Sequence, residues 1–545
     1  MDPTNSTPIC KTCGSSPSSQ FPVPPSPTPH LYHTLHQPDA SEVIALRQVI
    51  LRVNSDKSRL DDEIAHAEAV LNRLHRDHEA LHTFITEHDA FLAPVRRLPS
   101  EILTRIFALC LLEYETSSLD SRRAPLLLMQ VCKGWRETAL STQNLWSSIT
   151  LTASGCSNAS LAKLWLSRAM SLPLTVRLDS EGRPHSKVKR LHRAIAVLVQ
   201  FCDRWKDLDI ALPFTTMSCL DSIRHRLPLL ESLRICYQHS SERWHRELNL
   251  FDYAPRLRGL CIKGRIPYHM LKIPWHQLTE LDAPFHSIAE CFETLQLSLS
   301  LIKCTVDNSF GPSGDISDPE SRTITIQFPH MRFFKITSPD YSSDIFSCVK
   351  LPILHELHVA YQCNDFVIPS WLPQQPFLSL LSHSSRTLRK LKLGSLYKYT
   401  DSAYIAHCLR SLPSLTELSL RGWRGWLTAD LLGPLTRGPL VNAGNYLVPN
   451  LEVLEIHDSA IDIYCSANMI ESRWWFEDDI YGGARLTSVR FELQNIKSWL
   501  IEPGILRKLL KFRHGGMDIE IISVVDNIYL LNDFEQLTGI SGPPE

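Results

Sequence analysis

Four residues between positions 78 and 88 have the types and spacing to bind a metal. His78, Glu79 and His82 form the pattern His-Glu-x-x-His, in which two histidines on one helix face bind zinc and the glutamate acts as a general base. His88 would be a third ligand only if the chain turned back after His82. Ile85 stands where a glycine would end the helix, and in a continuous helix His88 lies roughly 15 Å from His78 along the axis. The spacing therefore argues against a zinc protease.

Two further patterns suggest metal or phosphate chemistry, and neither is complete. Cys10 and Cys13 form a Cys-x-x-Cys pair that is followed by His30 and His36, at a spacing that zinc sites allow. The proline-rich stretch between the pairs offers no helix or apolar core to hold a metal, so zinc is the less favoured alternative. Residues 259–266 have the glycine spacing of a phosphate-binding loop but lack its lysine and its serine or threonine. These patterns therefore predict no metal, no cofactor and no catalytic residue.

The composition predicts an intracellular folded protein made of several domains or of one long repeat array. The chain has 545 residues, of which 43% are hydrophobic and 21% are charged, and its net charge is −2. This balance argues against broad binding to nucleic acids or to an acidic membrane. No apolar run approaches the ~20 residues of a membrane span, and residues 1–20 lack an apolar secretory core. The 15 cysteines are scattered, as in a reducing compartment, so we expect a cytoplasmic or nuclear location.

A long amphipathic helix is predicted for residues 41–92, after a leader of residues 1–40 whose Ser, Thr, Pro and Gly content predicts disorder. Steps of four and three residues reach thirteen seam positions, ten of them apolar: Leu46, Ile50, Val53, Lys57, Leu60, Ile64, Ala67, Leu71, Leu74, His78, Leu81, Ile85 and His88. This heptad pattern predicts either a coiled coil that can self-associate through residues 41–90, or a single helix packed on the following domain.

Three short apolar helices are predicted between residues 93 and 149. Pro99 suits a first helical turn, and Glu101 lies where the helix dipole favours an anion. Apolar residues then recur with helical spacing at Ile102, Leu103, Ile106, Phe107 and Cys110. A second helix is expected over residues 124–133, ended by Gly134, and a third begins at Trp135. A unit this small has more apolar residues than its own core needs, which indicates a permanent partner.

The stretch LPSEILTRIF…LLLMQVCKGWRETALSTQNLWSSI resembles the F-box, with its Leu-Pro-x-Glu-Ile-Leu start, Val-Cys-Lys-x-Trp-Arg centre and Leu-Trp end. The resemblance covers residues 93–149. It implies binding to the Skp-family adaptor of Skp–cullin–F-box ubiquitin ligases and, through that adaptor, to a cullin. The implied adaptor-contact residues, which the sequence does not separate from internal core, are Leu98, Pro99, Glu101, Ile102, Leu103, Ile106, Phe107, Val131, Cys132, Trp135, Leu145 and Trp146. The alternative is that these helices only cap the region that follows.

Residues 150–540 carry a repeat of the form Leu-x-x-Leu-x-Leu. Copies begin at residues 230, 257, 331, 354, 388, 415, 451 and 486, and weaker ones lie at 205–210 and 278–282. The apolar ends of each Leu-x-Leu point inward and the residue between them points outward, so the units must stack to bury their apolar side. The expected fold class is α/β, an irregular leucine-rich-repeat solenoid with a parallel sheet on its concave face. The alternative is an ordinary α/β domain. A heptad before the box and leucine-rich repeats after it resemble a group of fungal F-box proteins.

The outward residues of these strands are the predicted target-binding residues. The basic ones are Arg234, Lys335, His358, Lys392 and Arg490. Aromatic clusters at Trp423, Trp426 and residues 474–476 are either anchors for a target or fillers between uneven repeats. The resemblance and these strands together predict a substrate-recognition subunit of a ubiquitin ligase that binds an unknown protein target. The alternatives are an F-box scaffold that degrades nothing, and a repeat protein that binds proteins or nucleic acid.

Overall fold

The fold is taken from a computed structural model, which separates into two units, Met1–Pro99 and Ser100–Glu545. The structure describes residues 22–112, 119–153, 159–180, 189–237, 247–264, 266–285, 288–307, 325–337, 342–360, 374–396, 402–422, 429–437, 446–458, 463–474, 483–493, 502–524 and 528–538. Cys10 and Cys13 lie outside these residues, and so do Trp423, Trp426 and the aromatic residues at 475 and 476.

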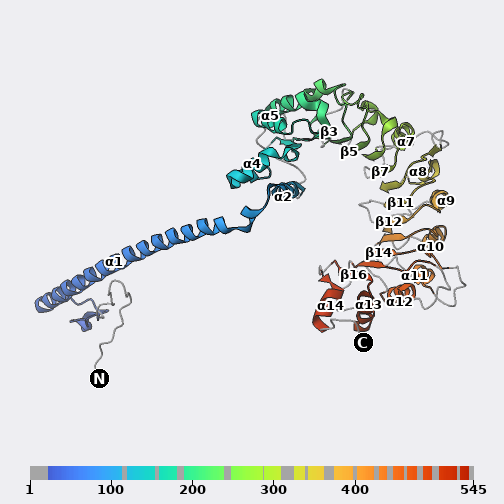
Figure 1. The fold of residues 1–545 in the computed structure, drawn as a ribbon. Helices are drawn as coiled ribbons and strands as arrows, with labels where there is room; N and C mark the ends of the chain where they lie inside the picture. Colours follow the sequence, from blue (N-terminus) through green and yellow to red (C-terminus); the bar gives the residue numbers. More distant parts are fainter. Residues whose placement is uncertain are drawn as a thin grey trace. The chain divides into compact units, whose positions relative to one another are not determined.

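The first unit is dominated by α1 (Ala40–Leu92), one continuous helix that confirms the long helix predicted from the heptad pattern (Figure 1). A capping box starts it: the Asp39 carboxylate accepts from the Glu42 backbone N at 2.8 Å, and the Glu42 carboxylate accepts from the Asp39 backbone N at 2.9 Å. Pro94 follows its end and begins the short 3-10 helix η2 (Pro94–Arg97). Another 3-10 turn, η1 (Pro29–Leu31), precedes α1.

The second unit begins with three helices, α2 (Ser100–Leu112), α3 (Leu128–Val131) and α4 (Lys133–Ser141), and with η3 (Gln143–Trp146). The second of them, α3, is shorter than the predicted helix over residues 124–133. The predicted break at Gly134 is wrong. The chain is extended at Cys132, with φ −160° and ψ 173°, and Gly134 belongs to the first turn of α4. Cys132 is the N-cap of α4, where its Sγ accepts a hydrogen bond from the backbone N of Trp135 at 3.5 Å.

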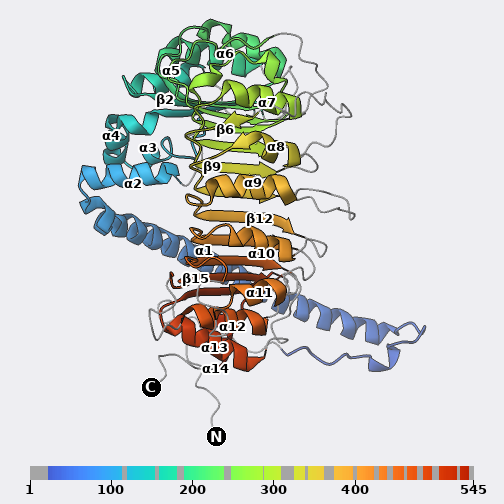
Figure 2. The same ribbon diagram turned by 90° about the vertical axis from the view of Figure 1, so that its right-hand side faces the viewer.

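The remainder of the second unit is built on one large sheet whose strands follow one another in chain order (Figure 2). Its described strands are β1 (Ser148–Thr152), β2 (Leu174–Asp179), β3 (Trp205–Ala211), β4 (Ser232–Cys236), β5 (Gly259–Lys263), β6 (Glu280–Pro284), β7 (Lys303–Asp307), β9 (Phe333–Thr337), β11 (Glu356–Ala360), β12 (Lys390–Leu396), β13 (Glu417–Gly422), β14 (Val453–Asp458), β15 (Ser488–Leu493), β16 (Asp518–Ser523) and β17 (Ile528–Tyr529). All neighbouring pairs are parallel except β16 and β17. A separate parallel pair joins β8 (Ile326–Gln327) to β10 (Val349–Lys350).

The described helices of this region are α5 (Ala159–Arg168), α6 (Lys189–Leu198), α7 (Ile288–Leu297), α8 (Ser342–Cys348), α9 (Gln374–Ser384), α10 (Ser402–Arg410), α11 (Ala429–Leu435), α12 (Ile463–Trp474), α13 (Pro503–His514), α14 (Leu530–Thr538), η5 (Val199–Arg204), η6 (Phe214–Ile223), η7 (Tyr268–Met270) and η8 (Trp275–Gln277). Most of the helices lie on the outer, convex side of the curved sheet, and the strands line the inner side (Figure 1). Beside β7 to β14, no helix of this unit that the structure describes lies on the inner face of the sheet (Figure 1).

Each Leu-x-Leu pattern forms a strand because its two apolar ends enter the space between sheet and helices. In β11, Leu357 and Val359 are 0% and 2% exposed, while His358 between them is only half-buried. All ten predicted copies are strands of the large sheet. Neighbouring copies pair directly or through one further strand between them. The mixed α/β class and the parallel sheet are thus confirmed.

Candidate docking surfaces

The two sides of α2 have different surroundings. Leu103 and Phe107 are 8% and 0% exposed, and the Phe107 ring lies with its centroid 5.0 Å from that of Trp135 on α4. The other side of the helix carries Ile102 and Ile106, which are 42% and 37% exposed. Residues four apart share one face of a helix, so Ile102 and Ile106 form an apolar strip that the domain does not cover.

Further uncovered apolar residues extend this exposed set. Leu109 on α2 is 60% exposed, and Leu127 and Val131, at the start and end of α3, are 45% and 56% exposed. Exposure of this many large aliphatic side chains within one small domain is the signature of a contact surface for a partner. Leu109 and Leu127 were not predicted as contact residues, although Leu109 continues the spacing of Ile102 and Ile106.

Leu145 and Trp146 belong to the interior and not to the contact surface, since both are 0% exposed. The Trp146 indole Nε1 donates to the carbonyl oxygen of Ala139 at 2.9 Å, and its ring meets that of Trp165 on α5 edge-to-face at 4.9 Å. Trp165 in turn donates its indole N–H to the carbonyl oxygen of Ser148 at 3.0 Å, at the start of β1. Together with Leu103 and Phe107, these residues are core, which is one of the two roles that the sequence left open for them.

The other predicted contact residues are partly or fully accessible. Leu98 and Trp135 are half-buried, and Pro99, Glu101 and Cys132 are exposed. Glu101 lies in the first turn of α2, as predicted, where the helix dipole favours a negative charge.

A second candidate surface is a row of side chains that crosses the inner face of the sheet. The register pairs one residue of each strand from β1 to β16 directly with one of the next: Thr150, Arg177, Asp209, Arg234, Cys261, Asp282, Thr305, Lys335, His358, Lys392, Ser419, Glu455, Arg490 and Glu520. Neighbours in such a row are separated by the strand spacing of about 4.8 Å. All five predicted target-binding residues belong to it.

Part of this row lines a cavity of about 400 Å³ on the inner face between β9 and β15. Four of the five predicted residues line it, namely Lys335, His358, Lys392 and Arg490. Arg234 does not, because β5, β6 and β7 separate its strand from β9. The structure also adds Arg421, His457 and Glu492 to the lining. Each of them follows a residue of the row by two positions and therefore points to the same inner face of the sheet.

Cations outnumber carboxylates in the lining of this cavity. Lys392 Nζ lies 3.5 Å from Glu455 Oε2, and Arg490 Nη2 lies 3.2 Å from Glu492 Oε1. Lys335 and Arg421 have no acidic partner within the part of the chain that the structure describes. The cavity can therefore accept a negatively charged group without first losing an ion pair.

The two histidines of the cavity contribute little to its positive charge. Burial lowers the pKa of His358 and of His457, although Glu356 and Glu492 lie 2.7 Å and 2.5 Å from their rings and act in the opposite direction. Burial raises the pKa of Glu455, but the hydrogen bond from Ser419 and the charge of Lys392 prevail, so its pKa is lowered. The positive charge thus resides on the lysines and arginines.

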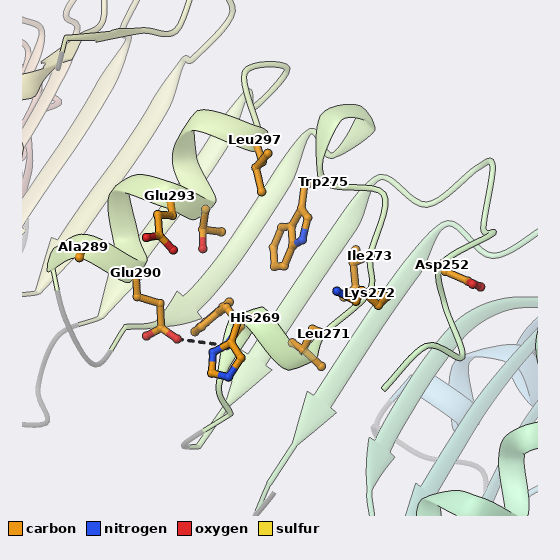
Figure 3. A pocket seen from close by; sticks show the side chains of 12 residues that line it. Asp252, His269, Leu271, Lys272, Ile273, Trp275, Ala289, Glu290, Glu293 and Leu297 are labelled. Atoms are coloured by element: carbon orange, nitrogen blue, oxygen red, sulfur yellow. Dashed lines mark hydrogen bonds between the residues drawn. The ribbon is translucent and has the colours of Figure 1, made fainter. Parts of the chain in front are cut away.

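A larger hollow of about 750 Å³ lies between the segment that holds η7 and η8 and helix α7 (Figure 3). Leu271, Ile273, Trp275 and Leu297 line it, and Glu290 accepts a hydrogen bond from the Tyr268 backbone N at 3.0 Å. The sequence did not predict this hollow, because its walls come from turns and a helix without a common motif. It shares no residue with the row across the sheet.

The structure bears on the predicted metal patterns and on the aromatic cluster at Trp474. Across the described ranges, no three His, Cys, Asp or Glu side chains gather to hold a metal ion, and α1 continues unbroken past Ile85. Trp474 is 4% exposed, and the guanidinium of Arg485 lies 3.3 Å from the centroid of its ring, so this aromatic fills space between repeats. In the described part of the chain, no helix is both long and apolar enough to cross a bilayer.

These surfaces define a protein with a helical docking domain joined to a curved parallel sheet. Comparison with known families agrees for the first part: residues 95–152 match the family described as F-box-like. The chain thus contains an F-box-like domain, which implies binding to a Skp-type adaptor. A search of curated proteins finds no match to the chain.

Proposed function

We propose that this protein is the substrate-recognition subunit of a Skp–cullin–F-box ubiquitin ligase. The observation that carries the proposal is the exposed apolar set of the F-box-like domain, above all Ile102, Ile106 and Val131. Their burial against the adaptor would remove apolar surface from water, which is the main driving force of such permanent contacts. Leu98, Pro99, Glu101, Cys132 and Trp135 complete the proposed contact.

The sheet region is proposed to be a leucine-rich-repeat solenoid that recruits the target on its inner face. The row across the sheet supports this proposal, because a single register holds its side chains on the open side. Lys335 in the row on β9, and Arg421 beside the row on β13, supply uncompensated positive charge, which suits an acidic surface on the target.

The chemistry of ubiquitin transfer belongs, on this proposal, to other subunits. The chain would act by holding its target near a ubiquitin-loaded enzyme, which raises the effective concentration of one for the other. No catalytic side chains and no cofactor are then required, and the place of action is the cytoplasm or nucleus.

The proposal is tested by protein half-lives in cells that carry either the wild-type chain or the Ile102→Asp, Val131→Asp variant. We expect proteins that co-purify with both chains to be long-lived only in cells with the variant, because the variant binds targets but not the adaptor. A Lys335→Glu, Arg421→Glu variant should lose those proteins, whereas Lys163→Glu on α5 should retain them. Unchanged half-lives would favour a scaffold that binds the adaptor without degrading its partners.

A further inference from the structure

Helix α1 exposes the apolar seam of its heptads. The exposed fractions of its large aliphatic seam residues beyond Leu46 run from 36% at Leu60 to 64% at Leu81. They lie on one continuous helix, so the aliphatic residues form a seam along it that is interrupted by Lys57 and His78. A seam of this length is the surface on which a second helix packs.

The positions beside the seam carry mostly negative charge. With Ile50, Ile64 and Leu71 at position a of the heptad, the flanking positions e and g between residues 56 and 68 are Asp56, Asp61, Glu63 and Glu68. All four are acidic. Most arginines of the same stretch and its surroundings lie at positions c and f, away from the seam, namely Arg52, Arg59, Arg73 and Arg76, whereas Arg47 lies at position e before the stretch.

This charge pattern opposes a parallel pair of α1 with itself. In a parallel pair, position g of one helix faces position e of the next heptad on the other helix. Asp56 would therefore face Asp61, and Glu63 would face Glu68, on both sides of the dimer. Lys57 occupies position a, so it would also meet its own copy inside the seam. Each of these contacts joins like charges.

We propose that α1 is the binding site for a helix of another protein that has an apolar seam and basic flanks. Lysine or arginine at its e and g positions would pair with the four carboxylates, and an acidic residue at one seam position would meet Lys57. The charges at positions e and g then select the partner, while burial of the exposed aliphatic seam residues contributes most of the binding free energy. All residues of this site belong to α1, outside the F-box-like match of residues 95–152.

Two synthetic helices test the proposal against the full-length chain. Both have the same isoleucine and leucine seam with one glutamate placed to meet Lys57, and they differ only in having lysine or glutamate at all e and g positions. We expect the basic helix to bind at least about tenfold more tightly than the acidic one. Raising the salt from about 0.05 M to about 0.5 M should reduce that difference, because the flanking charges are exposed to solvent.

Charge reversal provides the matched control. The variant with Asp56→Lys, Asp61→Lys, Glu63→Lys and Glu68→Lys should prefer the acidic helix. The variant with Asp62→Lys, Glu79→Lys and Glu87→Lys, at positions f, b and c, should keep the preference of the wild type. A Leu60→Gln, Ile64→Gln variant should bind neither helix while circular dichroism shows α1 still helical.

Three results would overturn the proposal. Equal binding of both helices would show that the flanks do not select. Binding of neither helix would show that the chain itself covers the seam. A wild-type chain that dimerises, and that becomes monomeric on Leu60→Gln and Ile64→Gln, would make a second copy the occupant. None of these results bears on adaptor binding, since no adaptor is present in the experiment.

Discussion

The rings of Phe107 and Trp135 lie 5.0 Å apart between centroids and are inclined by 58°, which joins α2 to α4 across the core of the F-box-like domain. Phe107 is fully buried, whereas Ile106, the residue before it, is 37% exposed. Within one turn of α2, Phe107 therefore packs in the core of the domain, while Ile106 leaves an apolar side chain exposed on its surface.

Phe107→Ala should reduce the free energy of unfolding of the domain by about 3–5 kcal/mol, because it removes a buried aromatic ring and leaves a cavity. Urea unfolding of the full chain measures the change. Leu109→Ala, at a position 60% exposed, should change the same quantity by less than about 0.5 kcal/mol. Equal effects of the two substitutions would contradict the assignment of core and surface.

Arg473→Met should destabilise the C-terminal repeats by about 3–5 kcal/mol. The guanidinium is 0% exposed and donates to the carbonyl oxygens of Leu435 at 2.6 Å, Val448 at 3.0 Å and Leu447 at 2.6 Å. Methionine leaves these carbonyls without their donor. Thermal unfolding of the full chain measures the loss, and Arg507→Met on the exposed side of α13 is the control. A melting temperature equal to that of the control would refute this role.

Gly264→Ala should be poorly tolerated, at a cost of about 2–4 kcal/mol. Gly264 has φ +92°, and an added Cβ would lie 2.0 Å from the carbonyl oxygen of Tyr237. Gly134→Ala is the matched comparison, since its Cβ would meet nothing within 4 Å and it lies in α4. It should stabilise the protein by about 0.5–1 kcal/mol. The prediction fails when both variants unfold at the same urea concentration.

Stability should fall as the pH drops through about 6.5, the ordinary histidine value. Burial lowers the pKa of His358 and of His457 in the folded protein, so the unfolded chain binds more protons in this range. The stability that the neutral rings contribute is therefore present above that pH and is lost below it. Urea unfolding at pH 7.5 and at pH 5.5 measures the slope, which His457→Gln should reduce. A slope unchanged by this substitution would speak against the buried neutral ring.

Much of the fold follows from periodicity. The heptad of α1 and the ten Leu-x-Leu strands are visible because burial repeats with the period of each element. Strand β7 escaped the pattern because Cys304 replaces the expected leucine, although it is 0% exposed. Strands β1, β2 and β16 were also missed, since they lie where the repeat is incomplete.

The candidate site was less accessible to sequence reasoning for a physical reason. Apolar residues occupy both faces of α2, so spacing alone cannot tell which face the domain covers and which it leaves open. The break at Cys132 depends on an extended residue that caps α4 through its sulfur, and cysteine is a weak sign of such a cap. The cavity on the sheet required the register, which places Arg421 and Glu492 beside the predicted row.

The most direct test of the central claim is the affinity of the full-length chain for a purified Skp-type adaptor. We predict that the wild type binds and that Ile102→Asp with Val131→Asp weakens binding by about thirtyfold or more, because both side chains are exposed in the free protein. Leu164→Asp on α5, which is 54% exposed and outside the F-box-like match, should bind like the wild type. A wild-type chain that does not bind the adaptor, or a double variant that binds as tightly, would contradict the account.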